Sequence, residues 1–119
     1  MTPHEDPHRH LPLTPHSFQI LLSLLDQEMH GYSIIKDIEA RTEGEMILGT
    51  STVYAAVKRM VLEQLLEEVP PQPGDASAGP RRKYYGLTEL GARILASEAA
   101  RLTDLVAMPE VVALARQGR

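Results

Sequence analysis

The sequence contains no cysteine and no tryptophan, and it has one phenylalanine among its 119 residues. Without cysteine the chain can form neither disulfides nor thiolate metal sites, which fits a reducing compartment. With so few large aromatic residues, the core must be built from Leu, Ile, Val, Met and Ala side chains. A chain of this length supports a single core and therefore one domain.

Long apolar runs are also missing. The longest are far shorter than a membrane span, and the N-terminus lacks the apolar stretch of a signal peptide. We therefore expect a cytoplasmic protein that does not enter a membrane. The chain has no Gly-rich phosphate loop, no His-Glu-x-x-His motif and no cysteine nucleophile, so we expect neither enzymatic activity nor a cofactor.

An excess of positive charge is absent as well, because the net charge is −4 at pH 7. The charges are unevenly distributed, however. Residues 1–48 carry three cations and eight anions, whereas residues 49–87 carry five cations and four anions. The five cations form two tight groups, Lys58–Arg59 and Arg81–Lys83, and the anions lie between them. The local field can therefore be positive although the whole chain is acidic.

Residues 1–13 are predicted to be a disordered tail, since they contain prolines and histidines without an apolar period. Three of these histidines, His4, His8 and His10, could form a weak metal site, but a polar tail is the favoured interpretation and we expect no metal. A first helix is predicted from the N-cap Thr14 to about residues 28–29. A second helix should run from about residue 31 to residue 42, where Gly44 follows its end.

A third helix is predicted to begin at Thr50, Ser51 or Thr52, each of which can act as an N-cap. Its apolar positions repeat at helical spacing and predict a core-facing stripe. The opposite face carries short polar side chains first and basic ones further on. This is typical of a helix whose N-terminal half enters a DNA major groove. The residues expected nearest the DNA are Ser51, Thr52, Tyr54, Ala55 and Lys58.

Two short strands, at residues 65–69 and 84–87, are predicted to form a hairpin with a Pro- and Gly-rich tip at residues 70–80. The cations Arg81, Arg82 and Lys83 precede the second strand, and they could hold DNA phosphates or merely discourage edge pairing. Tyr84 and Tyr85 alternate across the strand, so we expect Tyr85 to pack inward and Tyr84 to face a phosphate.

A last helix should start at Thr88, and Pro109 should interrupt it before a short final turn. The fold class predicted is thus mainly α with a small β-hairpin, in the order helix, helix, helix, strand, strand, helix. This is a winged helix-turn-helix at residues 14–87 followed by a C-terminal helical region at residues 88–119.

Three segments of the sequence resemble the signature segments of PadR-type transcriptional regulators. They are His30-Gly31-Tyr32-Ser33-Ile34, the stretch from Thr52 to Met60, and the stretch from Arg82 to Gly91. The resemblance covers about residues 13–106 and implies a winged-helix fold and operator binding as a bacterial repressor. It also implies homodimerisation through the C-terminal helix. We expect the dimer face to comprise Leu95, Leu102, Leu105 and Val106.

The sequence departs from this family at two points. The family usually has Gly where Gln64 stands, so the third helix either ends in a strained left-handed residue or ends differently. Some short members stack flat aromatic drugs on a tryptophan of the C-terminal helix, which this chain lacks. The sequence therefore disfavours a multidrug-sensing role, and it leaves open whether another small-molecule effector exists.

A second interpretation is a winged-helix module that binds a protein partner and not DNA. The net negative charge and the acidic pair Glu67–Glu68 beside the hairpin motivate it. Salt dependence distinguishes the two, because each neutralised DNA phosphate contributes about −0.9 to the log–log slope of affinity against salt. Tyr54 likewise has two interpretations, as a DNA contact or as a rim residue with its ring on the core.

Overall fold

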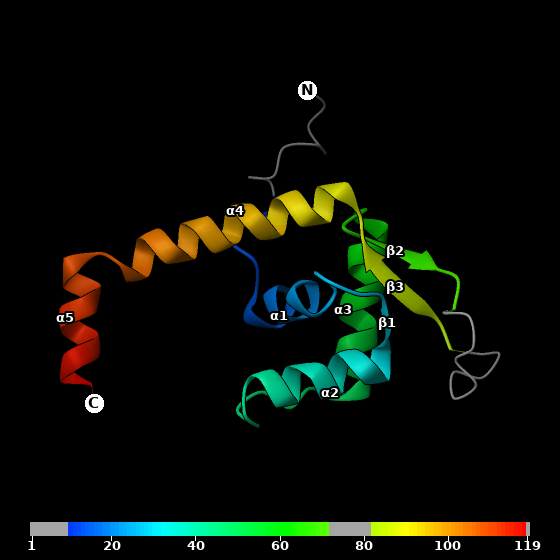
Figure 1. Cartoon of the computed structure of the whole chain (residues 1–119), viewed down its shortest axis with the longest axis horizontal. Coiled ribbons are helices and arrows are strands. Elements are labelled where there is room, and N and C mark those ends of the chain that lie inside the picture. Colours follow the sequence, from blue (N-terminus) through cyan, green and yellow to red (C-terminus); the bar gives the residue numbers. More distant parts are fainter. Residues whose placement is uncertain (1–9, 72–81, 119) are drawn as a thin grey trace.

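The computed structural model describes residues 10–71 and 82–118. Three helices and a small sheet form the body of the molecule, and a long helix extends from that body to a final short one (Figure 1). In chain order the elements are α1 (Pro15–Ser23), β1 (Met29–His30), α2 (Gly31–Arg41), α3 (Thr50–Leu62), β2 (Leu66–Val69), β3 (Tyr84–Leu87), α4 (Glu89–Val106) and α5 (Pro109–Gln117).

The sheet has three antiparallel strands in the order β1-β3-β2. The predicted hairpin is confirmed, with Glu68 opposite Tyr85 and Val69 opposite Tyr84. The strand β1 was not predicted. It pairs Met29 with Tyr85 and so covers the other edge of β3. Most of the predicted hairpin tip, from residue 72 on, lies outside the described residues, and so does Arg81.

The first helix is shorter than predicted, because α1 ends at Ser23 and not near residues 28–29. The amides of Leu24 and Leu25 turn back to the carbonyls of Leu21 and Leu22 at 3.1 and 3.2 Å, a tighter i→i−3 pattern that ends the helix. The chain then needs extended backbone at residues 29–30 to pair with β3.

The core lies where the three helices of the body meet the sheet and the first half of α4. Its members are aliphatic apart from Tyr85, as the composition predicted. The largest fully buried apolar side chains are Ile20, Leu21, Ile34, Ile38, Val53, Val57, Met60, Leu65, Leu66 and Ile94. Most of them lie on α1, α2 and α3, and those of α3 lie on the apolar stripe that the helical spacing predicted.

The start of α4 is fixed against the end of α3. Thr88 caps α4 as predicted, accepting the amide of Gly91 at 2.9 Å and donating to the carbonyl of Gln64 at 2.6 Å. A Cβ at Gly91 would lie 2.1 Å from the carbonyl oxygen of Leu65, so only glycine allows this approach. Beyond Glu98 the rest of α4 and all of α5 are exposed or half-buried.

Two further expectations need correction. Residues 10–13 are not part of a tail, because Leu11 and Leu13 pack against the core; residues 1–9 lie outside the described range. Leu95, placed on the dimer face by its helical spacing, is 4% exposed within its own chain. It belongs to the core of the monomer, because α4 packs on α1 along this part of its length.

Candidate nucleic-acid interface

The helix α3 separates its polar and apolar residues as predicted. Val53, Val57 and Met60 are buried, whereas the five candidate contact residues on this helix are exposed. The structure therefore places Ser51, Thr52, Tyr54, Ala55 and Lys58 together on the solvent side of one helix. The prediction of a hydroxyl N-cap was wrong, because the N-cap is Gly49, which has no side chain, and Thr50 is already the first residue of α3.

Tyr54 combines the two interpretations left open by the sequence. Its side chain is 44% exposed. A Cβ built on Gly31 would lie 2.6 Å from the Tyr54 Cζ atom, so the ring rests directly on the first residue of α2. The glycine thereby sets how the tyrosine projects from the surface.

The two adjacent cations of α3 differ in their surroundings. Arg59 turns toward α1, donating to the Ser17 hydroxyl at 2.9 Å and lying 3.6 Å from the Glu63 carboxylate. Lys58 is exposed, and within the described part of the chain it has no ion-pair partner. Of the two, Lys58 is therefore the one whose charge is available to a phosphate.

At the start of β3, the exposed Arg82 approaches the body of the domain. Its Nη1 atom lies 3.0 Å from Nε2 of His30. Lys83 is exposed beside it. Both cations thus lie next to the end of β1 and the start of α2, because β1 pairs with β3 at this point.

The prediction that only one of the two tyrosines is buried was wrong. Tyr84 is 3% exposed and Tyr85 is 7% exposed. The unpredicted β1 explains the error, since it pairs His30 with Tyr84 and so brings the His30 ring against the Tyr84 ring. The Tyr84 ring packs edge-on against His30, with centroids 5.3 Å apart. It has little surface left for a phosphate.

His30 itself is buried and is the N-cap of α2. Its Nδ1 atom accepts the amide of Ser33 at 3.2 Å and so caps α2. Its Nε2 atom lies 2.9 Å from the Ser33 hydroxyl and 3.0 Å from Nη1 of Arg82, so this nitrogen faces both groups.

Two exposed residues of α2 were missed. Tyr32 is 55% exposed, and the Nζ atom of Lys36 lies 5.6 Å from the centre of its ring. Tyr32 stacks on His30 at 6.4 Å, which places it near Arg82. The available signal was the spacing, because both residues fall off the Ile34–Ile38 stripe of α2 and one is a cation.

A buried carboxylate on α4, Glu98, was also missed. It is 1% exposed, and hydrogen bonds from the Arg101 side chain hold its pKa below the usual range for Glu. The amide of Leu13 adds a bond that acts in the same direction. The sequence signal was a Glu four residues after Ile94 on the apolar stripe, with an Arg three residues further on.

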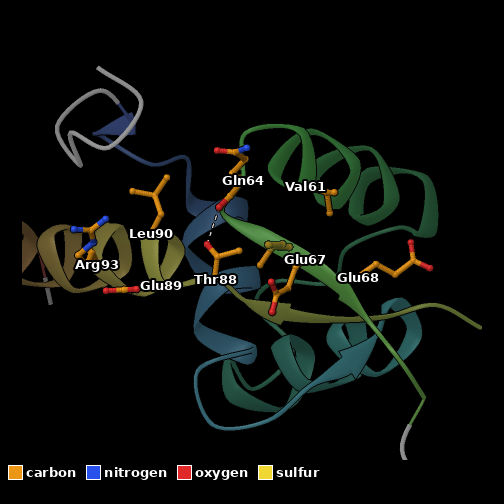
Figure 2. A pocket seen from close by; sticks show the side chains of 9 residues that line it. Val61, Gln64, Glu67, Glu68, Thr88, Glu89, Leu90 and Arg93 are labelled. Atoms are coloured by element: carbon orange, nitrogen blue, oxygen red, sulfur yellow. Dashed lines mark hydrogen bonds between the residues drawn. The ribbon is translucent and has the colours of Figure 1, made fainter. Parts of the chain in front are cut away.

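A groove of about 570 Å³ lies between the end of α3, β2 and the start of α4 (Figure 2). Leu66, Leu90 and Val61 supply apolar surface to it, and Arg93 is its single cation. Its carboxylates come from Glu67, Glu68 and Glu89. A dashed line in Figure 2 marks the bond from Thr88 to the Gln64 carbonyl at the border of this groove.

Other kinds of site find no support in the described ranges. No group of three His, Asp or Glu residues there is arranged to hold a metal ion. His4 and His8 lie outside these ranges, and His10 lies 3.9 Å from Glu63. None of the described helices has both the length and the apolar character needed to cross a membrane.

Three helices followed by a β-hairpin, with the polar face of the third helix exposed beside that hairpin, define a winged helix-turn-helix protein. Residues 20–97 match the transcriptional regulator PadR-like family. The chain therefore belongs to the PadR-like family of transcriptional regulators, which confirms the resemblance of its three motif segments.

Individual relatives agree with this membership. An uncharacterised protein of Lysinibacillus sphaericus is 34% identical over 76 residues, which cover 64% of this chain and 67% of that protein. A PadR family transcription regulator from Clostridium difficile is 28% identical, with a TM-score of 0.61 over 76% of this chain and 92% of its own. PadR of Bacillus subtilis, solved in complex with operator DNA, shares the fold at 22% identity, with a TM-score of 0.60 over 72% of this chain and 47% of its own.

Proposed function

We propose that this protein is a homodimeric repressor that binds a specific DNA operator in the cytoplasm. The observation that carries the proposal is the solvent face of α3, where hydroxyls, a tyrosine and a lysine lie together on one rigid helix. Such a face fits a major groove, where hydroxyl and amine groups reach base edges. The structural likeness to a PadR protein bound to operator DNA supports this assignment.

In this proposal α3 reads the sequence and the hairpin grips the backbone. Ser51, Thr52 and Tyr54 face the bases, and Lys58 neutralises a phosphate at the edge of the groove. Arg82 and Lys83, with Arg81 before them, contact the flanking phosphates. Tyr84 stabilises the base of the hairpin from within.

The proposed dimer forms through the end of α4 and through α5. Leu105 and Val106 are 43% and 59% exposed, and Leu114 on α5 is 66% exposed. Together with the half-buried Leu102 they form an apolar surface on the part of the chain that extends away from the body (Figure 1). A second copy would bury it, which a single small domain cannot do.

We further propose that an effector, where one acts, binds in the groove between α3, β2 and α4. A molecule there would contact the end of the recognition helix at Val61 and Gln64. Three carboxylates and one guanidinium favour an amphipathic cation over an anion. Cationic aromatic compounds should then raise the melting temperature of the protein, and a Glu67→Gln, Glu89→Gln variant should lose that response.

The alternative function is a protein-binding winged helix. Glu67 and Glu68 are both exposed on β2, which favours a basic partner at that edge. If this alternative holds, replacing the basic residues of the hairpin would leave binding to the protein partner intact.

The variant Arg82→Ala, Lys83→Ala tests the proposal against this alternative. We expect weaker binding to all DNA sequences alike, and a log–log salt slope that becomes shallower by about 4 in a dimer, because each lost phosphate contact contributes about 1. The measurement is fluorescence anisotropy at several salt concentrations, with Glu67→Gln, Glu68→Gln as the matched control. A changed sequence preference at an unchanged slope would show that the hairpin reads bases.

A further inference from the structure

The buried carboxylate Glu98 lies where α4 leaves the body of the domain. Gly91, Ile94 and Leu95 precede it as the other buried residues of this helix. After it, every residue of α4 is exposed or half-buried. Glu98 is therefore the last buried residue before α4 leaves the body.

The carboxylate is held from both sides of the junction. Its Oε2 atom accepts the backbone amide of Leu13 at 2.8 Å, across 85 residues of sequence. Arg101 binds it with two nitrogens, Nε to Oε1 at 2.5 Å and Nη2 to Oε2 at 3.0 Å. A fork of this kind fixes direction as well as distance. Glu98 thus ties α4 to the segment that leads into α1.

This attachment continues to the recognition helix. Leu13 precedes Thr14, whose hydroxyl caps α1 by accepting the amide of Ser17 at 3.1 Å. Ser17 is 3% exposed, and its hydroxyl accepts a hydrogen bond from the Arg59 side chain of α3 at 2.9 Å. A continuous series of hydrogen bonds and one peptide link therefore joins α4 to α3 through the start of α1.

We propose that Glu98 is a positioning residue that fixes the angle between α4 and α3 and thereby selects the spacing of operator half-sites. The inference rests on the proposed dimeric, DNA-binding function. In such a dimer α4 and α5 connect the two halves, so this angle sets the separation of the two recognition helices. Half-sites of two-fold proteins recur at about one helical turn, 34–36 Å, or at multiples of it. A joint free to rotate would accept several spacings.

The angle can be measured without DNA. Because the chain has no cysteine, spin labels can be attached at Ser51→Cys on α3 and Asp104→Cys on α4 without other substitutions. Labelled protein is diluted with unlabelled protein, so that electron–electron resonance reports the distance within one chain. We expect a narrow distance distribution in the parent and a clearly broader one in Glu98→Gln. The amide has one acceptor oxygen and one donor group, so it cannot accept the Leu13 amide together with both nitrogens of Arg101. Glu89→Gln changes an exposed carboxylate in the first turn of α4; it is the matched control, and its distance distribution should stay narrow.

The effect of Glu98→Gln on DNA binding is measured as affinity for pairs of half-sites that are separated by spacers of different lengths. The parent should prefer one spacing, and Glu98→Gln should lower that preference by about tenfold, while affinity for an isolated half-site stays within about twofold. A merely structural role would weaken binding at all spacings equally. Ser17→Ala leaves Glu98 in place, breaks the series at α1, and should flatten the spacing profile in the same way. It replaces Glu98→Gln in both measurements should that variant not fold.

The outcomes separate this inference from the proposed function. An unchanged distance distribution in the variants overturns the positioning role, whether or not DNA is bound. A broadened distribution with an unchanged spacing profile overturns the selection of half-sites. If the parent binds no DNA at all, the proposed function fails, and the distance measurement alone decides the role of Glu98.

Discussion

At Gln64 the backbone is left-handed, with a φ of 66°. The amides of Gln64 and Leu65 bond to the carbonyls of Val61 and Met60, at 3.0 and 2.9 Å, so the end of α3 is a Schellman motif. This motif normally has glycine at the left-handed position, because a side chain there is strained. Of the two possibilities that the sequence left open at Gln64, the structure has the strained one.

Replacing Gln64 by glycine should therefore stabilise the protein by about 1 kcal/mol. The bond from Thr88 is unaffected, since it uses the Gln64 carbonyl. Urea denaturation followed by circular dichroism measures the change. Gln64→Ala is the control and should bring no gain, because alanine keeps the Cβ that causes the strain. A gain of similar size in both variants would contradict this explanation.

Glu98 predicts a dependence of stability on pH. Its pKa is lowered in the folded chain by Arg101 and Leu13. A lowered pKa means that the carboxylate contributes stability above its unfolded pKa, about 4.3, and that this contribution is lost as the pH falls through the folded pKa. Glu98→Gln should thus be less stable than the parent at pH 7, and the difference should shrink below about pH 4.

Denaturation midpoints at a series of pH values between neutral and strongly acidic would check this prediction. The exposed Glu89→Gln provides the comparison on the same helix. A stability difference between the parent and Glu98→Gln that stays constant down to the lowest pH would show that the carboxylate is not the source of the stabilisation.

At the scale of the elements, the helices followed from periodicity and caps. The stripe of α3, the start of the last helix at Thr88 and the break at Pro109 were predicted correctly, because each depends on residues close in sequence. The hydroxyl cap of α3 and the short turn after Pro109 were wrong, since Gly49 is the cap and α5 is a helix from Pro109 to Gln117. The end of α1 and the strand β1 were not predicted. Residues 29–30 are extended because they pair with β3, more than fifty residues further on. No local pattern records such a contact.

The site was predicted to a similar extent. The solvent face of α3 follows from its own sequence, so the exposure of its five candidate residues was predicted correctly. Tyr84, Leu95 and Glu98 depend on what packs against them: β1 covers Tyr84, α1 covers one side of α4, and Leu13 reaches Glu98. Spacing along one element shows which residues share a face. It does not show which part of that face another element covers.

At the scale of the whole molecule, the exposed apolar residues at the end of α4 are the basis of the proposed dimer. Replacing Leu105, which is 43% exposed, by glutamate should leave the monomer folded and raise the dimer dissociation constant at least about tenfold. Analytical ultracentrifugation measures this change. Leu25→Glu is the control, at an apolar residue 54% exposed near the end of α1. A Leu105→Glu chain that stays fully dimeric would contradict the proposed dimer surface.

The net charge of the molecule is the strongest argument against DNA binding, and the distribution of charge answers it. Residues 1–48 carry three cations and eight anions, and this excess accounts for the net negative charge of the chain. Lys58, Arg82 and Lys83 nevertheless lie exposed on α3 and beside the start of β3, which together form the proposed contact surface. Affinity for DNA depends on these local charges, and it falls with salt in proportion to the phosphates they neutralise.

The salt dependence of binding to a palindromic site selected from the source genome is therefore the most direct test of the central claim. Three described cations in each of two protomers, with or without Arg81, predict a log–log slope between about −5 and −7. Fluorescence anisotropy between low and physiological salt gives this slope. A slope near zero, or the absence of any selected site, would contradict the claim that this winged helix is a DNA-binding regulator.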